Sequence, residues 1–136
     1  MRRFAVYLAV AVLAAPAALA GARPAAAQES RPSPELIARN LAENILGEGT
    51  VRSVRVEGGG RWITISWDAV LYRSTHTRAK NREQLRGEAE LATGAIMGVL
   101  KPQMIHFTIW LGSRAIAQGT RSTDGLAMTY AKDLDG

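Results

Sequence analysis

Apolar residues recur at spacings of four and three between Asn81 and Leu100, and this pattern predicts a long α-helix with one buried side. Pro102 ends the pattern, because proline cannot continue a helix. The helix is therefore the element on which we expect the rest of the domain to pack. Its buried side is predicted to consist of Leu85, Ala89, Ala92, Ile96 and Val99.

Three glycines lie on a second side of this helix. Gly87, Gly94 and Gly98 share that side with Leu91. Each glycine in a helix interior costs about 1 kcal/mol relative to alanine, so we expect a compensating contact. The sequence predicts that a second backbone, from the sheet or from another helix, approaches these glycines closely. On this hypothesis, replacing Gly94 by alanine does not stabilise the protein.

The segment from Ser33 to Gly47 carries the signals of a shorter helix. Ser33 suits the N-cap, Pro34 suits the first turn, and Gly47 suits the C-terminal cap. The apolar face is predicted to comprise Ile37, Leu41 and Ile45, flanked by Ala38 and Ala42.

Alternation of apolar and polar residues predicts strands in the remaining segments. Glycines at 58–60 join the first two strands, and Gly112-Ser113 joins the third and fourth, so each pair is predicted to be a hairpin. The predicted strands span residues 50–57, 61–72, 104–111, 115–121 and 126–131.

The predicted order of elements is α-β-β-α-β-β-β, which is typical of a small α+β domain. Such a chain most often closes as an antiparallel sheet with both helices packed on one face, and we expect that arrangement here. Residues 33–136 have the length of a single domain. Residues 28–32 are interpreted as a short polar linker before it.

Residues 1–27 have the pattern of a bacterial signal peptide, with a basic start, an apolar run and small-residue cleavage sites. We expect cleavage after Ala27, where a polar stretch begins, and cleavage after Ala20 is the alternative. A retained leader is also considered, because residues 4–22 are uncharged and almost long enough to span a bilayer. The protein is therefore expected to be exported, periplasmic or extracellular, and to contact a membrane only during export unless the leader is retained.

The formal charge of +5 is partly a property of the leader. Residues 1–27 hold three arginines and no acidic residue, so their removal leaves +2. This balance and the lack of a nucleic-acid-binding motif argue against a nucleic-acid partner. The chain has no cysteine, which excludes disulfide bonds and thiolate metal sites. We expect neither a metal nor a cofactor.

The polar positions of two predicted strands form a candidate binding surface. Trp62 and Tyr72 come from the strand at 61–72, and His106 and Trp110 come from the strand at 104–111. Aromatic side chains beside a few polar groups suit a ligand or a protein partner. A merely solvated outer face is the alternative interpretation.

The register of the second hairpin bears on this surface. We expect Ile109 to lie opposite Ile116, so that small side chains face Trp110 and His106 and leave a depression beside them. These small residues are Ala115, Ala117 and Gly119.

Glu88 is the first candidate for chemistry, because it falls within the apolar arc of the long helix. If it is buried without a partner, desolvation raises its pKa, as a general acid or base requires. The alternatives are a position at the rim or an ion pair with Arg73 or Arg78. Asp68 and His106 are further catalytic candidates, but no catalytic motif accompanies them.

A basic segment leads into the long helix and contains Arg78, Lys80 and Arg82. With the backbone N–H groups of the helix N-terminus, these cations could hold an anion. A solvated basic loop explains the same pattern.

The lack of a catalytic signature and the aromatic outer face lead to one functional expectation. We predict a non-enzymatic exported module that binds a protein partner or a second copy of itself through Trp62, Tyr72, His106 and Trp110. The alternative is a small-ligand-binding protein or a small enzyme with a polar cavity, using Glu88, Asp68 or His106.

Overall fold

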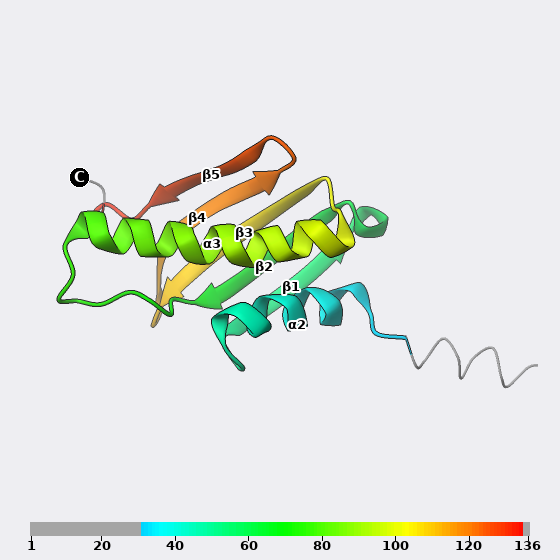
Figure 1. The fold of residues 1–136 in the computed structure, drawn as a ribbon, viewed down its shortest axis with the longest axis horizontal. Coiled ribbons are helices and arrows are strands. Elements are labelled where there is room, and N and C mark those ends of the chain that lie inside the picture. Colours follow the sequence, from blue (N-terminus) through cyan, green and yellow to red (C-terminus); the bar gives the residue numbers. More distant parts are fainter. Residues whose placement is uncertain (1–30, 135–136) are drawn as a thin grey trace, which may run out of the picture. The chain divides into compact units, whose positions relative to one another are not determined.

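The computed structural model describes residues 31–134 of the chain. The predicted signal peptide and residues 28–30 of the predicted linker lie outside the described residues. The elements follow the predicted order α-β-β-α-β-β-β (Figure 1). They are α2 (Pro34–Leu46), β1 (Val51–Glu57), the short helical turn η1 (Gly58–Gly60), β2 (Trp62–Asp68), α3 (Arg78–Leu100), β3 (Met104–Leu111), β4 (Arg114–Ser122) and β5 (Gly125–Tyr130).

The strands form a five-stranded sheet in the order β1-β2-β3-β4-β5. Three neighbouring pairs are antiparallel, but β2 and β3 run parallel. The sheet is therefore mixed, which corrects the expectation of a purely antiparallel one. The physical reason is the connection: α3 carries the chain back between β2 and β3, and such a helical crossover joins parallel neighbours.

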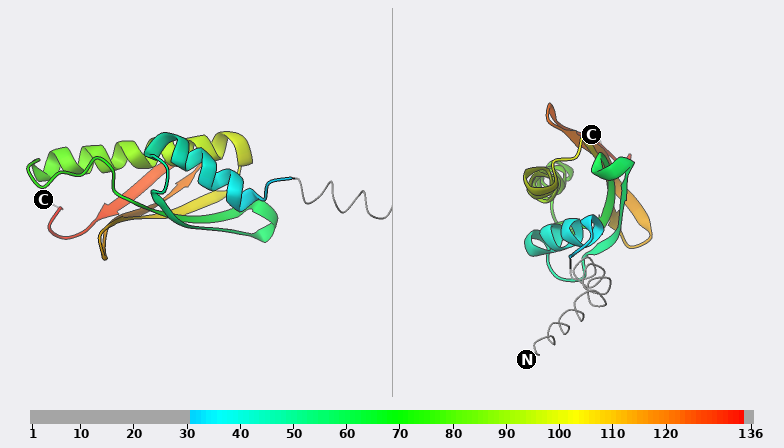
Figure 2. Two further views of the ribbon diagram at one scale, coloured as in Figure 1. Left: turned by 90° about the horizontal axis from the view of Figure 1, so that it is seen from below. Right: turned by 90° about the vertical axis from the view of Figure 1, so that its right-hand side faces the viewer.

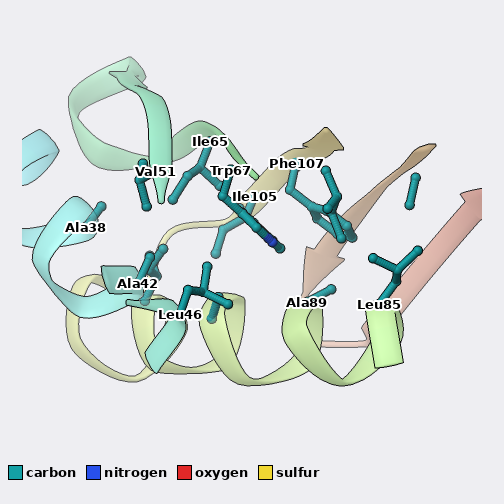
Figure 3. Packing of buried hydrophobic residues seen from close by; sticks show 14 of the residues in the cluster. Ala38, Ala42, Leu46, Val51, Ile65, Trp67, Leu85, Ala89, Ile105 and Phe107 are labelled. Atoms are coloured by element: carbon teal, nitrogen blue, oxygen red, sulfur yellow. The ribbon is translucent and has the colours of Figure 1, made fainter. Parts of the chain in front are cut away.

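Both helices lie on the same side of the sheet (Figure 2). The inner side chains of β2 and β3 pack beneath them, and the rings of Trp67 and Phe107 stack with centroids 5.6 Å apart (Figure 3). Burial of each large apolar side chain contributes about 1.5–3 kcal/mol. The helices contribute the buried residues Ala38, Ala42, Leu46, Leu85, Ala89, Ala92 and Ile96.

Side-chain caps set the beginnings of both helices. The Ser33 hydroxyl accepts a hydrogen bond from the Leu36 N–H at 3.1 Å, as expected for an N-cap. The Thr77 hydroxyl does the same for the Lys80 N–H at 3.1 Å, so α3 begins before the periodic segment. At the other end of α3, Val99 is 57% exposed rather than buried. A seven-residue repeat drifts by about 20° per heptad on a straight helix, which moves Val99 towards the rim.

The glycines of α3 do not meet a second backbone, which corrects the prediction of close approach. A Cβ atom at Gly87 or Gly98 would have open space around it. At Gly94 the nearest atoms belong to the Arg121 guanidinium, 3.8 Å away, which is an ordinary contact. The close packing of α3 is made instead by Ala89 and Ala92, which are fully buried.

The β3–β4 hairpin turns at Gly112-Ser113 as predicted, but its register is shifted by a bulge. Ile109 lies opposite Ala117, while Trp110 lies opposite Ala115, so Ile116 is the extra residue. Ile116 and Ala117 are both buried. The predicted pairing of Ile109 with Ile116 is therefore wrong, because alternation alone does not reveal an inserted residue.

Candidate functional site

The sheet face turned away from the helices is covered by no element of residues 31–134 (Figure 2). The parallel register of β2 and β3 places Thr64 beside His106 and Asp68 beside Trp110. The register continues across the sheet, so that outer side chains form rows perpendicular to the strands. One row consists of Ser53, Ser66, Thr108, Gln118 and Thr129. The next row consists of Arg55, Thr64, His106, Thr120 and Ala127.

A groove of about 390 Å³ crosses this outer face over β3, β4 and β5. Its two walls are the β3–β5 parts of the two rows, and its floor is the strand backbone between them. His106 belongs to one wall, whereas Trp110 does not line the groove. None of the lining residues is an aspartate, glutamate, lysine or arginine. The groove therefore offers hydroxyl, amide and imidazole groups rather than charge.

The shifted register changes what lies beside the predicted depression. Gly119 faces Phe107 on the inner side of the sheet, and Gln118 and Thr120 occupy the outer positions. Ala115 lies opposite Trp110 as predicted, but Ala117 pairs with Ile109 and Gly119 with Phe107 on the inner side. The predicted floor formed by all three small residues is therefore wrong.

Trp110 belongs instead to a corner of the outer face where Arg52 and Asp68 also lie. Arg52 lies at a register shift in β1, between Val51 and Ser53. Its guanidinium lies 5.0 Å from the centre of the Trp110 ring. Arg52 Nε also donates to Asp68 Oδ1 at 2.7 Å, and Arg52 Nη2 donates to the Gly112 carbonyl. A cation–π contact of this kind contributes about 0.5–1 kcal/mol at an exposed site. The Arg52 guanidinium therefore contacts the indole at this end of the sheet.

The other two aromatic candidates lie in different environments. Trp62 is 38% exposed on β2 and sits against Gly58, where a Cβ atom would lie 2.7 Å from the indole. Tyr72 is not on the outer face, because β2 ends at Asp68 rather than at residue 72. Tyr72 is half-buried and packs against the core cluster. The structure thus places Trp62, His106 and Trp110 on one face, and not Tyr72.

Glu88 is buried beneath the helix side of the sheet, with 2% of its surface exposed. Its Oε2 accepts hydrogen bonds from the backbone N–H groups of Val70 at 2.9 Å and Leu71 at 2.6 Å, and its Oε1 accepts from the Trp67 indole at 3.1 Å. Burial raises the pKa of Glu88, and these three hydrogen bonds oppose the rise. Every donor is neutral and the side chain is buried, so both alternatives, an ion pair with Arg73 or Arg78 and a position at the rim, are wrong. Glu88 anchors the segment that follows β2.

Asn81 is a second buried anchor that sequence reasoning missed. Its side-chain oxygen accepts from the Arg73 N–H at 3.0 Å, and its amide donates to the Arg73 carbonyl at 2.9 Å. Asn81 and Glu88 lie two turns apart on the same side of α3. The sequence does contain a signal for this anchor: Asn81 is a polar residue within the apolar arc of the helix, seven positions before Glu88.

The three catalytic candidates are not brought together. Asp68 lies level with Trp110, four residues beyond His106 along the parallel strands, so the two are about 13 Å apart along the sheet. Asp68 is occupied by Arg52. Glu88 lies on the opposite side of the sheet from both. Within the described part of the chain, no group of three or more metal-ligating side chains is assembled.

The basic segment at the start of α3 is tied into the fold. Arg82 donates to the Leu134 carbonyl, and Lys80 lies 3.9 Å from the Glu83 carboxylate. The positive charge of Arg78 helps to keep the pKa of Asp133 below its usual value, after the larger effect of the Arg114 hydrogen bond. Anion binding at this helix end stays a prediction.

Among the helices of residues 31–134, none has the length and apolar character to cross a membrane. Searches against protein-family models, curated proteins and solved structures gave no significant match to this chain, so its site is interpreted from its own geometry.

Proposed function

We propose that this protein is an exported, non-enzymatic module that binds a protein partner, or a second copy of itself, through the outer face of its sheet. One observation carries the proposal: within residues 31–134, no element covers one face of the five-stranded sheet, while both helices pack on the other. The signal-peptide pattern of residues 1–27 supports export.

The side chains on this face suit a protein interface. Tryptophan is enriched among the residues that dominate binding energy at protein interfaces. Trp110 contacts the Arg52 guanidinium, and Trp62 lies at the opposite end of β2 and β3. Between them lie neutral hydroxyl groups and His106. Such a surface offers two apolar anchors separated by hydrogen-bonding groups.

Sedimentation velocity and affinity capture together test this proposal. The mature protein is compared with Trp62→Ala and Trp110→Ala, and the matched control is Leu91→Ala, which removes an apolar side chain that is 62% exposed on α3. We expect the two tryptophan variants to lose self-association or partner capture, and the control to retain them. A protein that is monomeric at all concentrations, and whose variants capture the same partners as the wild type, would refute the proposal.

A small-ligand-binding protein is the second candidate function, and the groove beside His106 favours it. Its volume of about 390 Å³ lies within the range of small-molecule sites. The enzymatic form of this candidate is less well supported, because Glu88, Asp68 and His106 lie in separate places. Thr120→Trp would fill the groove, and Thr64→Trp is its control on the same face outside it. Loss of ligand binding in the first variant alone would favour this candidate.

A further inference from the structure

Strand β5 forms an open edge of the sheet, since it pairs with β4 on one side and lies at the margin of the described fold (Figure 1). The Ala131 N–H donates to the Ile116 carbonyl at 2.9 Å, so the backbone hydrogen-bonding groups of residue 131 point towards β4. The direction of these groups alternates from one residue to the next along a strand. The N–H and C=O groups of Leu126, Met128 and Tyr130 therefore point away from β4, to the open edge. This edge is therefore available for pairing with another strand.

The opposite edge of the sheet is protected in three ways. Side chains of α2 form hydrogen bonds with the backbone of Val51. Glu43 accepts from its N–H at 3.2 Å, and Arg39 donates to its carbonyl at 2.7 Å. A register shift follows Val51, and three charged side chains, Arg52, Arg55 and Glu57, lie along the rest of β1. Natural proteins use such bulges and charges to prevent edge-to-edge pairing.

Strand β5 has none of these protections. Its sequence, GLAMTY, contains no charge and no proline, and its pairing with β4 has no register shift. An uncharged edge meets no like-charge repulsion when it faces a copy of itself. The occupant that this edge fits best is therefore a second copy of the same strand.

The geometry of an antiparallel β5 pair agrees with this assignment. A two-fold axis at Met128 places Leu126 opposite Tyr130 of the second copy, so the residues with open backbone groups face one another. Their side chains are half-buried on the helix side of the sheet and would form apolar cross-strand pairs. On the outer face, Ala127 would lie opposite Thr129 of the second copy. The contact is isologous, as closed dimers require.

We propose that two copies of the protein associate through antiparallel pairing of their β5 strands, which joins the two sheets into one continuous sheet. This inference goes beyond the proposed function, because the contact is the β5 edge and not the outer face of the sheet. Ala127 and Thr129 line the groove on the outer face, so pairing at β5 would continue that groove across the two-fold axis. The dimer therefore enlarges the same binding face rather than covering it.

Disulfide trapping tests the pairing, and the chain's lack of cysteine makes the result clear. In the proposed dimer, positions 127 and 129 form a non-hydrogen-bonded pair with Cα atoms about 4.5 Å apart, which a disulfide can span. The exported protein carrying Ala127→Cys and Thr129→Cys together is expected to form a covalent dimer on mild oxidation. Each single variant is its control and should not, because its cysteine faces a different residue. No dimer, or equal dimer from the single variants, would overturn the inference.

Charge variants give an independent measurement by sedimentation equilibrium. Ala127→Lys with Thr129→Glu places opposite charges face to face across the two-fold axis, whereas Ala127→Lys with Thr129→Lys places like charges there. We expect the dissociation constant of the second protein to be about tenfold higher than that of the first. Equal constants would contradict β5 pairing.

These results are distinguishable from a failure of the proposed function. A monomer that still loses its partner on Trp110→Ala would refute the β5 inference and leave the outer-face proposal intact. A β5 dimer whose tryptophan variants capture the same partners would support the β5 inference and contradict the role of the tryptophans.

Discussion

Replacing the exposed glycines of α3 by alanine should stabilise the protein. Gly87 and Gly98 have open space where a Cβ atom would be added, so the new methyl group meets no obstacle. Alanine is favoured over glycine in a helix interior by about 1 kcal/mol. Gly94→Ala should behave similarly, because its nearest neighbour is the guanidinium of Arg121 at 3.8 Å.

The expected effect is large enough to measure by thermal unfolding. For a domain of about 100 residues, 1 kcal/mol corresponds to a shift in Tm of about 4 °C. Gly87→Ala should therefore raise Tm by about 4 °C, and the double variant with Gly98→Ala by about twice that. Circular dichroism melts at several protein concentrations give the values.

Gly119→Ala is the matched control on a strand. A Cβ atom there would lie 2.1 Å from the Ala127 carbonyl oxygen and 2.8 Å from the Phe107 ring, so the backbone would have to move. Overpacking of this kind costs about 1–3 kcal/mol. A Tm that falls for Gly87→Ala and Gly98→Ala would refute the reasoning.

Three further predictions concern the anchors of α3. Thr77→Ala removes the N-cap bond to Lys80 and should lower the free energy of unfolding by about 1 kcal/mol in urea titrations, with no loss expected for the exposed Thr75→Ala. Asn81→Ala leaves the Arg73 N–H without its partner, while the Arg73 carbonyl keeps its hydrogen bond from the His76 N–H. The change should cost about 1–3 kcal/mol by the same measurement, and a neutral variant would contradict this. Because burial raises the pKa of Glu88, the folded protein holds this proton more tightly than the unfolded chain does. The associated stability is therefore present at low pH. It is lost as the pH rises from the ordinary pKa of glutamate through the raised pKa of Glu88. Glu88→Gln should flatten this part of the stability profile and Glu90→Gln, an exposed control, should not; parallel profiles for wild type and Glu88→Gln would contradict the assignment.

Local signals in the sequence were sufficient for the elements and their order. The cap at Ser33 and the Gly112-Ser113 turn each act within a few residues, so their outcome can be derived from neighbouring positions. The parallel pairing of β2 with β3 joins segments about 40 residues apart, and the alternation of each strand is the same for either direction. The alternation of apolar and polar residues therefore does not determine whether neighbouring strands run parallel or antiparallel.

The candidate site was predictable only in part, for a related reason. The outer positions of Trp62, His106 and Trp110 follow from alternation within single strands. Tyr72 was misplaced because alternation continues beyond Asp68, where the hydrogen bonds to Glu88 replace the strand ladder. Similarly, the bulge at Ile116 moved Gly119 to the inner face. Contacts between distant segments decided both outcomes.

Site-specific photo-crosslinking in cells tests the outer face most directly. A photoreactive phenylalanine analogue is placed at Thr64, which is exposed at the centre of that face, and separately at Leu91, which is exposed on the helix side. The proposal predicts a crosslink to a partner or to a second copy from position 64 and none from position 91. Crosslinks from position 91 with none from position 64 would contradict binding through the outer face of the sheet.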